Sequence, residues 1–84
     1  MNRDEIKDIV LKYVIEEYQE DENDEITYDT PLISGGIVDS FSMVSLKRFL
    51  ETKYAIQIPD AKATPEAFDS VDNIIRLLAE FNIR

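Results

Sequence analysis

The spacing of apolar residues predicts an amphipathic helix at the start of the chain, over about Arg3 to Tyr18. Apolar side chains recur three or four residues apart, which places them on one helix face: Ile6, Ile9, Val10, Tyr13 and Val14. Asn2 stands where the N-cap of this helix belongs, and Glu5 follows three residues later, as in a capping box. The polar residues fall on the other side, so this helix is expected to contribute one face to a core.

The same spacing predicts two more helices, from Ser40 to about Tyr54 and from Ser70 to about Asn82. The core face of the middle helix is expected to hold Met43, Leu46, Leu50 and Tyr54, with Phe49 at its flank. The core face of the last helix is expected to hold Val71, Ile74, Ile75, Leu78 and Phe81. Asp39 and Asp69 directly precede these helices and are the predicted N-caps.

The segments between the helices have no regular period. The first, residues 19–38, is expected to be held to the bundle by its four large apolar or aromatic side chains: Ile26, Tyr28, Leu32 and Ile33. Gly35 and Gly36 near its end are both free to take positive φ. After the middle helix we expect a short extended piece, Ile56–Ile58, and a helical turn starting at Pro65.

These elements predict an all-α fold in residues 1–84, organised as a single domain. The expected architecture is a four-helix-type bundle with three main helices, one short helix and a long first loop. No apolar run is long enough to span a membrane, and the charged N-terminus lacks the apolar stretch of a signal peptide. We therefore expect a cytoplasmic monomer that does not insert into membranes.

Charge narrows the choice of partner. The formal net charge is -9, and no Lys or Arg lies between Tyr13 and Leu46, whereas carboxylates crowd the stretch from Glu16 to Asp29. Nucleic acid is disfavoured because phosphate binding needs cations, and a basic protein partner is favoured. The acidic run Asp21–Glu25 lacks the glycine and the spacing of a calcium loop, so at most weak binding of divalent ions is expected there.

The chain contains neither Cys nor His. This excludes disulfides and thiolate metal sites, and it removes the two side chains most used for nucleophilic and general-base work near neutral pH. We expect no catalytic residues and no resident metal, so this protein is not expected to be an enzyme. Reactive chemistry would have to arrive on a prosthetic group.

Ser40 stands where a glycine-containing loop meets the middle helix. Its hydroxyl is expected to be accessible, and the free N–H groups and positive dipole end of the helix favour an attached phosphodiester. Asp39 could cap the helix and also contact a metal ion or a modifying enzyme. One side of the helix, away from the predicted core face, forms a candidate partner-binding face: Phe41, Val44, Ser45 and Arg48. The alternative is that Phe41 folds back on the loop and closes the core.

The segment from Gly35 to Leu46, with Asp39-Ser40 at its centre, closely resembles the attachment motif of acyl carrier proteins. Tyr54–Asp60 and Phe68–Val71 are similar to later segments of that family, so the resemblance covers nearly the whole chain. It implies that a Mg²⁺-dependent phosphopantetheinyl transferase attaches 4′-phosphopantetheine from coenzyme A to Ser40. The thiol of this arm would carry an acyl or aminoacyl group as a thioester, which a loading enzyme supplies and a downstream synthase or transferase consumes.

Two features depart from the pattern of fatty-acid biosynthesis carriers. Two residues rather than one separate Gly36 from Asp39, a spacing more similar to D-alanyl, aminoacyl or stand-alone peptidyl carriers. The middle helix, strongly acidic in fatty-acid carriers, here contains three cations and one acid: Lys47, Arg48, Lys53 and Glu51. The other interpretation left open is an acidic helical protein-interaction module without a prosthetic group, in which Ser40 is only a helix-start residue.

Overall fold

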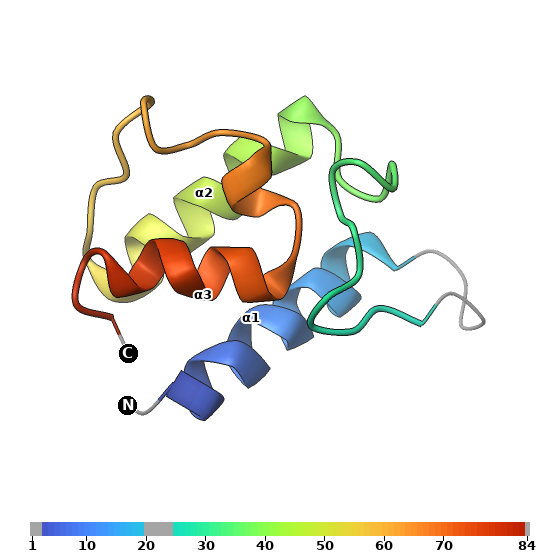
Figure 1. Cartoon of the computed structure of the whole chain (residues 1–84), viewed down its shortest axis with the longest axis horizontal. Coiled ribbons are helices and arrows are strands. Elements are labelled where there is room, and N and C mark those ends of the chain that lie inside the picture. Colours follow the sequence, from blue (N-terminus) through green and yellow to red (C-terminus); the bar gives the residue numbers. More distant parts are fainter. Residues whose placement is uncertain (1–2, 20–24, 84) are drawn as a thin grey trace.

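The computed structural model describes residues 3–19 and 25–83 and shows an all-helical chain (Figure 1). Three α-helices follow one another along the sequence, with a short 3₁₀ helix before the last: α1 Arg3–Tyr18, α2 Ser40–Tyr54, η1 Glu66–Phe68 and α3 Val71–Ala79. Within the described ranges no residue is in a β-strand. The all-α prediction is confirmed, as are the bounds of α1 and α2 and the helical turn after Pro65.

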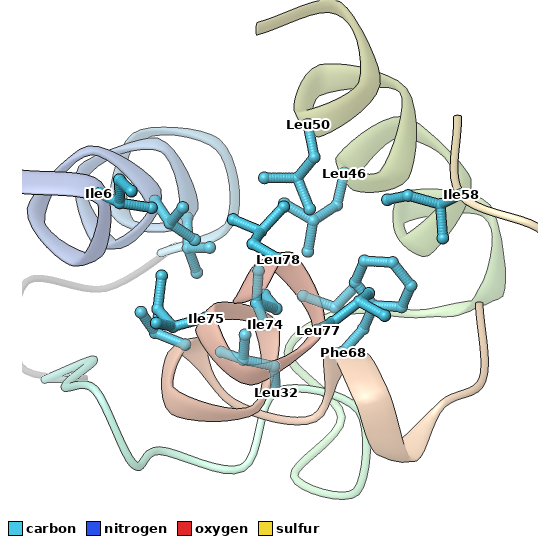
Figure 2. Close-up of a cluster of buried hydrophobic side chains, with 14 of the residues drawn as sticks. Ile6, Leu32, Leu46, Leu50, Ile58, Phe68, Ile74, Ile75, Leu77 and Leu78 are labelled. Carbon is cyan, nitrogen blue, oxygen red and sulfur yellow. The ribbon is translucent and has the colours of Figure 1, made fainter. Parts of the chain in front are cut away.

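The core is built around α3, which packs against both α1 and η1. Five of its nine residues are buried, so it is apolar on most sides: Val71, Ile74, Ile75, Leu77 and Leu78. Leu46 and Leu50 of α2 point toward these side chains, and Phe68 of η1 closes the other flank (Figure 2). In α1 the fully buried positions are spaced four residues apart: Ile6, Val10 and Val14. This spacing places them on one helix face, as the sequence pattern predicts.

The predicted start and cap of α3 are wrong. Ser70 has extended backbone angles, φ -154° and ψ 163°, so it precedes the helix, and its hydroxyl accepts a hydrogen bond from the N–H of Asn73 at 3.1 Å. Ser70 is therefore the N-cap, and Asp69 is not. The helix ends at Ala79 rather than Asn82, where the backbone turns left-handed with φ 64°. The predicted cap of α1, Asn2, lies outside the described residues.

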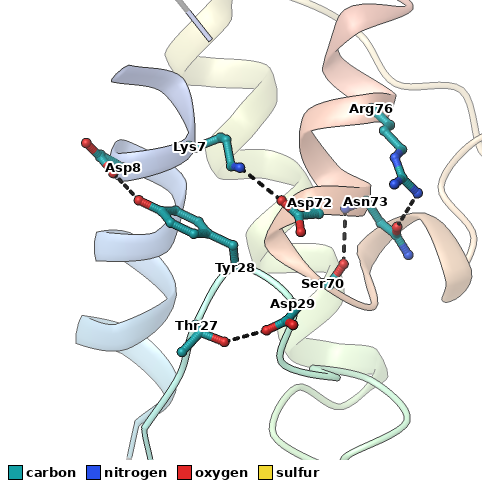
Figure 3. A network of polar contacts seen from close by, with 9 residues as sticks. All are labelled: Lys7, Asp8, Thr27, Tyr28, Asp29, Ser70, Asp72, Asn73 and Arg76. Atoms are coloured by element: carbon teal, nitrogen blue, oxygen red, sulfur yellow. Dashed lines mark hydrogen bonds and ion pairs between the residues drawn. The ribbon is translucent and has the colours of Figure 1, made fainter. Parts of the chain in front are cut away.

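The first loop is tied to α1 and α3 as expected. Ile26 and Leu32 are buried in the core. The hydroxyl of Tyr28 donates to the carboxylate of Asp8 on α1, and its carbonyl accepts the Asp72 N–H at the start of α3. Lys7 on α1 forms an ion pair with Asp72 at 3.1 Å, so the same corner joins all three segments (Figure 3). The loop is thus anchored by contacts that are distant in sequence.

No helix in the described part of the chain is long and apolar enough to cross a membrane. The predicted extended piece at Ile56–Ile58 forms no strand, but Ile58 is buried and its N–H donates to the Glu51 carboxylate at 2.9 Å. This bond holds the segment that follows α2 against the last turn of that helix.

Candidate functional site

Ser40 is the first residue of α2, and it is exposed. Nowhere in residues 3–19 and 25–83 does a side chain or backbone group hydrogen-bond to its hydroxyl. Asp39 is the N-cap, as predicted, because its carboxylate accepts the N–H of Ser42 at 2.8 Å. Hydrogen bonds from Ser42 lower the pKa of Asp39, which therefore stays ionised at neutral pH. The result is a free hydroxyl held at the positive end of a helix.

The turn before this junction, residues 32–38, is closed by its own backbone. The carbonyl of Leu32 accepts both the Ile37 N–H at 2.9 Å and the Val38 N–H at 2.8 Å. Leu32 and Val38 are buried, so both ends of the turn are fixed in the core. Because Val38 directly precedes Asp39, its burial fixes the position of the Asp39 backbone at the start of α2.

The two glycines in this turn serve different purposes. Gly36 has φ +79°, in the left-handed region that favours glycine. Gly35, although equally free to take positive φ, does not have it. Instead, a Cβ at Gly35 would lie 2.3 Å from the carbonyl oxygen of Pro31. The turn therefore needs glycine at 35 for space and at 36 for conformation.

Asp69, between η1 and α3, contacts this turn although it is distant in sequence. Its carboxylate accepts the N–H groups of Ile33 and Ser34, both at 2.8 Å, and the Ser34 hydroxyl at 2.9 Å. Its backbone carbonyl accepts the N–H of Leu32. Bonds from Ser34 and Ile33 lower the pKa of Asp69, so this group too is ionised at neutral pH. The sequence pattern predicts Asp69 as the cap of α3, but an Asp-Ser pair before a helix offers two candidates and nothing local distinguishes them.

The predicted partner-binding face of α2 is exposed. The side chain of Phe41 is 85% exposed and that of Val44 is 59% exposed, while Ser45 and Arg48 are also exposed. The alternative in which Phe41 folds back on the loop is wrong. Two large apolar side chains one helical turn apart are thus left in water beside Ser40, a grouping typical of a binding surface.

The charges of α2 are distributed unevenly. Lys47 pairs with Asp60 at 3.2 Å, and the single carboxylate of the helix, Glu51, turns toward the N–H of Ile58. Arg48 has no ion pair or hydrogen bond with any part of the chain that the structure describes. The exposed face therefore combines two apolar residues near Ser40 with a free guanidinium group two turns further along.

Other candidate sites are weaker. Among the described residues there is no group of three or more carboxylates placed to hold a metal ion, and Asp21–Asp24 lie outside those residues. An open depression of about 420 Å³ lies between α3 and the segment before η1, lined by residues that include Lys62, Arg76 and Leu77. None of the predicted site residues lines it.

No family model matches the chain, and no curated protein matches it. Among solved structures, a chain of the structure named "Crystal structure of FAD-dependent dehydrogenase" is similar, with 30% sequence identity and a TM-score of 0.71. The match covers 82% of this chain and 97% of that one, so the matched chain is itself a short helical domain. The fold class defined above is therefore shared with a solved protein. This chain belongs to the same family as that short chain, whose name assigns no function to the residues described above.

Proposed function

We propose that this protein is an acyl carrier protein that bears 4′-phosphopantetheine on Ser40 and presents acyl or aminoacyl thioesters to partner enzymes. The observation that carries the proposal is an exposed hydroxyl on the first residue of α2, directly after a cap that Asp39 forms, to which none of the described residues hydrogen-bonds. An inward-facing Ser40 would have been incompatible with modification by another enzyme. The motif resemblance supports the same function, and the all-helical fold is compatible with it.

The residues around Ser40 fit the prosthetic group. Its phosphodiester would lie at the positive end of α2, which favours a negative charge. In the attachment reaction the Ser40 oxygen forms a bond to the phosphorus next to pantetheine, the pyrophosphate bond of coenzyme A breaks, and adenosine 3′,5′-bisphosphate leaves. The hydroxyl proton passes to a base on the transferase. The arm supplies the thiol that the chain lacks, and the protein supplies the attachment point and the recognition surface.

The test is the intact mass of the protein after incubation with coenzyme A, Mg²⁺ and a phosphopantetheinyl transferase of broad specificity. We expect one phosphopantetheinyl adduct, which is lost in Ser40→Ala and kept in Ser42→Ala, a matched change two residues along the same helix. If the wild-type chain stays unmodified, the carrier function is wrong. The acidic interaction module without a prosthetic group is then the better interpretation.

The α2 face is the proposed docking surface for these enzymes. Phe41→Ala removes the most exposed apolar side chain and Arg48→Glu reverses the free charge, so both should lower kcat/KM of the transferase without unfolding the protein. Lys12→Glu is the control for Arg48→Glu, because it changes the net charge equally on an exposed position of α1. Normal modification of both α2 variants would show that the face is wrongly assigned.

A flavin-dependent dehydrogenase is one class of downstream enzyme to test, since the similar solved structure is named as an FAD-dependent dehydrogenase. The chain has only two glycines, adjacent at 35 and 36, and so lacks the spaced-glycine fingerprint of dinucleotide-binding folds. We therefore place the flavin on the partner. Such an enzyme would remove two electrons and two protons from the carried group, and loss of oxidised-flavin absorbance with the loaded protein, but not with Ser40→Ala, would identify it.

A further inference from the structure

Asp69 is far from Ser40 in sequence, yet it hydrogen-bonds to the turn that directly precedes Asp39 and Ser40. The three consecutive N–H groups of Leu32, Ile33 and Ser34 all donate to Asp69, the first to its carbonyl and the others to its carboxylate. The next bonds lie inside the turn. Gly36 donates to Ile33, and residues 37 and 38 donate to Leu32. The first residues of the turn are therefore held by bonds to Asp69, and its last residues are held by bonds within the turn that end directly before Asp39, the cap of α2.

Without the Asp69 carboxylate, the two ends of the turn would still be held, because Leu32 and Val38 are buried in the core. The tip of the turn would not be, since Ser34, Gly35 and Gly36 are exposed and no other side chain in the described residues bonds to them. The released N–H groups would bond to water. We therefore expect loss of the carboxylate to loosen the tip while the bundle stays folded.

We infer that Asp69 is a positioning residue for modification at Ser40: it holds the turn before α2 in the single conformation that a phosphopantetheinyl transferase recognises. This inference rests on the proposed function. None of the hydrogen bonds of Asp69 within the described residues goes to Ser40. Its effect is to fix in advance the backbone that the transferase would otherwise have to order on binding, and such ordering weakens binding.

The ionisation of Asp69 is consistent with this role. Hydrogen bonds from Ser34 and Ile33 lower its pKa, so the carboxylate is charged throughout the neutral range, and bonds to a charged acceptor are stronger than bonds between neutral groups. An amide in its place would keep one carbonyl acceptor for the two N–H groups. It would lose the second oxygen, which accepts the Ser34 hydroxyl at 2.9 Å.

The experiment measures kcat and KM of Ser40 modification by the transferase with coenzyme A, using the full chain. We expect Asp69→Ala to raise KM about tenfold and to change kcat less than about twofold. The free energy of ordering the turn would then weaken binding, whereas the chemical step would not change. Asp69→Asn should recover part of the loss and Ser34→Ala should lose least. Asp60→Ala, a matched change at an exposed carboxylate that pairs with Lys47, should leave KM unchanged.

A second readout separates positioning from simple destabilisation. Amide hydrogen exchange should speed up at Ile33 and Ser34 in Asp69→Ala and stay slow at Leu46 in the core. Val10→Ala, which leaves a cavity in α1, provides a comparably destabilised protein with the turn intact. Its KM should match that of the wild type.

Either of two results overturns the inference: an unchanged KM in Asp69→Ala, or an increase no larger than that in Val10→Ala. Both would occur with a wild-type chain that is modified normally, so they leave the carrier function intact. A wild-type chain that is never modified removes the proposed function, and the positioning role with it.

Discussion

Gly35 and Gly36 are adjacent and chemically identical, yet the turn needs them for different physical reasons. At Gly36 the requirement is conformational, because φ is +79° and nothing lies within 4 Å of an added Cβ. At Gly35 it is steric, because the same atom would lie 2.3 Å from the Pro31 carbonyl oxygen. A backbone carbonyl cannot swing away as a flexible side chain can, so the turn itself would have to move.

Gly35→Ala should therefore destabilise the protein more than Gly36→Asn. We expect a loss of about 1–3 kcal/mol in the free energy of unfolding for Gly35→Ala, as for other overpacked sites. For Gly36→Asn we expect less than about 1 kcal/mol, since asparagine tolerates left-handed backbone angles. Urea unfolding followed by circular dichroism measures both. Equal losses would mean that the Pro31 contact is relieved without cost.

At the residue scale the sequence was informative where a local rule applied. Asp39 followed by a helical pattern is a recognisable cap, and the exposed position of Ser40 follows from its place at the helix start. The role of Asp69 could not be read in the same way, because its partners Ile33 and Ser34 are brought to it only by folding.

At the element scale, the structure and the sequence pattern differ in which residue caps the start of α3. The hydroxyl of Ser70, not the Asp69 carboxylate, accepts the N–H of Asn73. Ser70→Ala should therefore lower the free energy of unfolding by about 1 kcal/mol, the usual cost of losing an N-cap. Ser45→Ala is the same change on the exposed face of α2 and should be neutral or slightly stabilising, because alanine favours helix. An unchanged free energy of unfolding in Ser70→Ala would indicate that Asp69, not Ser70, caps α3.

An aromatic pair joins α1 to α2. The rings of Tyr13 and Phe49 are stacked with centroids 3.9 Å apart and planes inclined by 9°. Tyr18 meets Tyr13 edge-on, and its hydroxyl donates to the carbonyl of Ser42, two residues after Ser40. The second half of α1 thus supports the first turn of α2, although the sequence pattern placed Phe49 only at the flank of the core face.

This contact predicts a measurable coupling. In a double-mutant cycle of Tyr13→Leu and Phe49→Leu, we expect a coupling free energy of about 0.5–1.5 kcal/mol, as for other aromatic pairs. Thermal or urea unfolding of the wild type, the two single variants and the double variant supplies the four values. Additive losses would show that the stacked rings contribute only buried area.

At the scale of the whole molecule, repulsion between like charges destabilises the folded state. The net charge is -9 on a body whose principal extents are 34, 26 and 18 Å. At about 0.01 M salt the screening length is about 30 Å, so charges repel one another across most of the molecule, whereas at about 0.15 M it is about 8 Å. Folding brings the carboxylates together and increases this repulsion.

The melting temperature should therefore rise as sodium chloride is increased between those two concentrations. Replacing two exposed carboxylates of the acidic stretch, Glu17→Gln and Glu25→Gln, makes the chain two charges less negative and should reduce the rise. Differential scanning calorimetry at fixed pH measures both proteins. A flat or falling curve for the wild type would contradict net self-repulsion, and it would indicate that ion pairs such as Lys7–Asp72 dominate instead.

The sequence by itself determined the helical class, the limits of α1 and α2, the cap at Asp39 and the place of Ser40, because each depends on residues within a turn or two of one another. Tertiary structure alone decided that Phe41 stays in water, that Gly35 must lack a side chain, and that Asp69 serves the turn before α2 rather than α3. These outcomes depend on which distant segments meet when the core forms. Periodicity and capping rules describe neighbours along the chain, and the neighbours of these residues are set by the packing of α3 and the first loop.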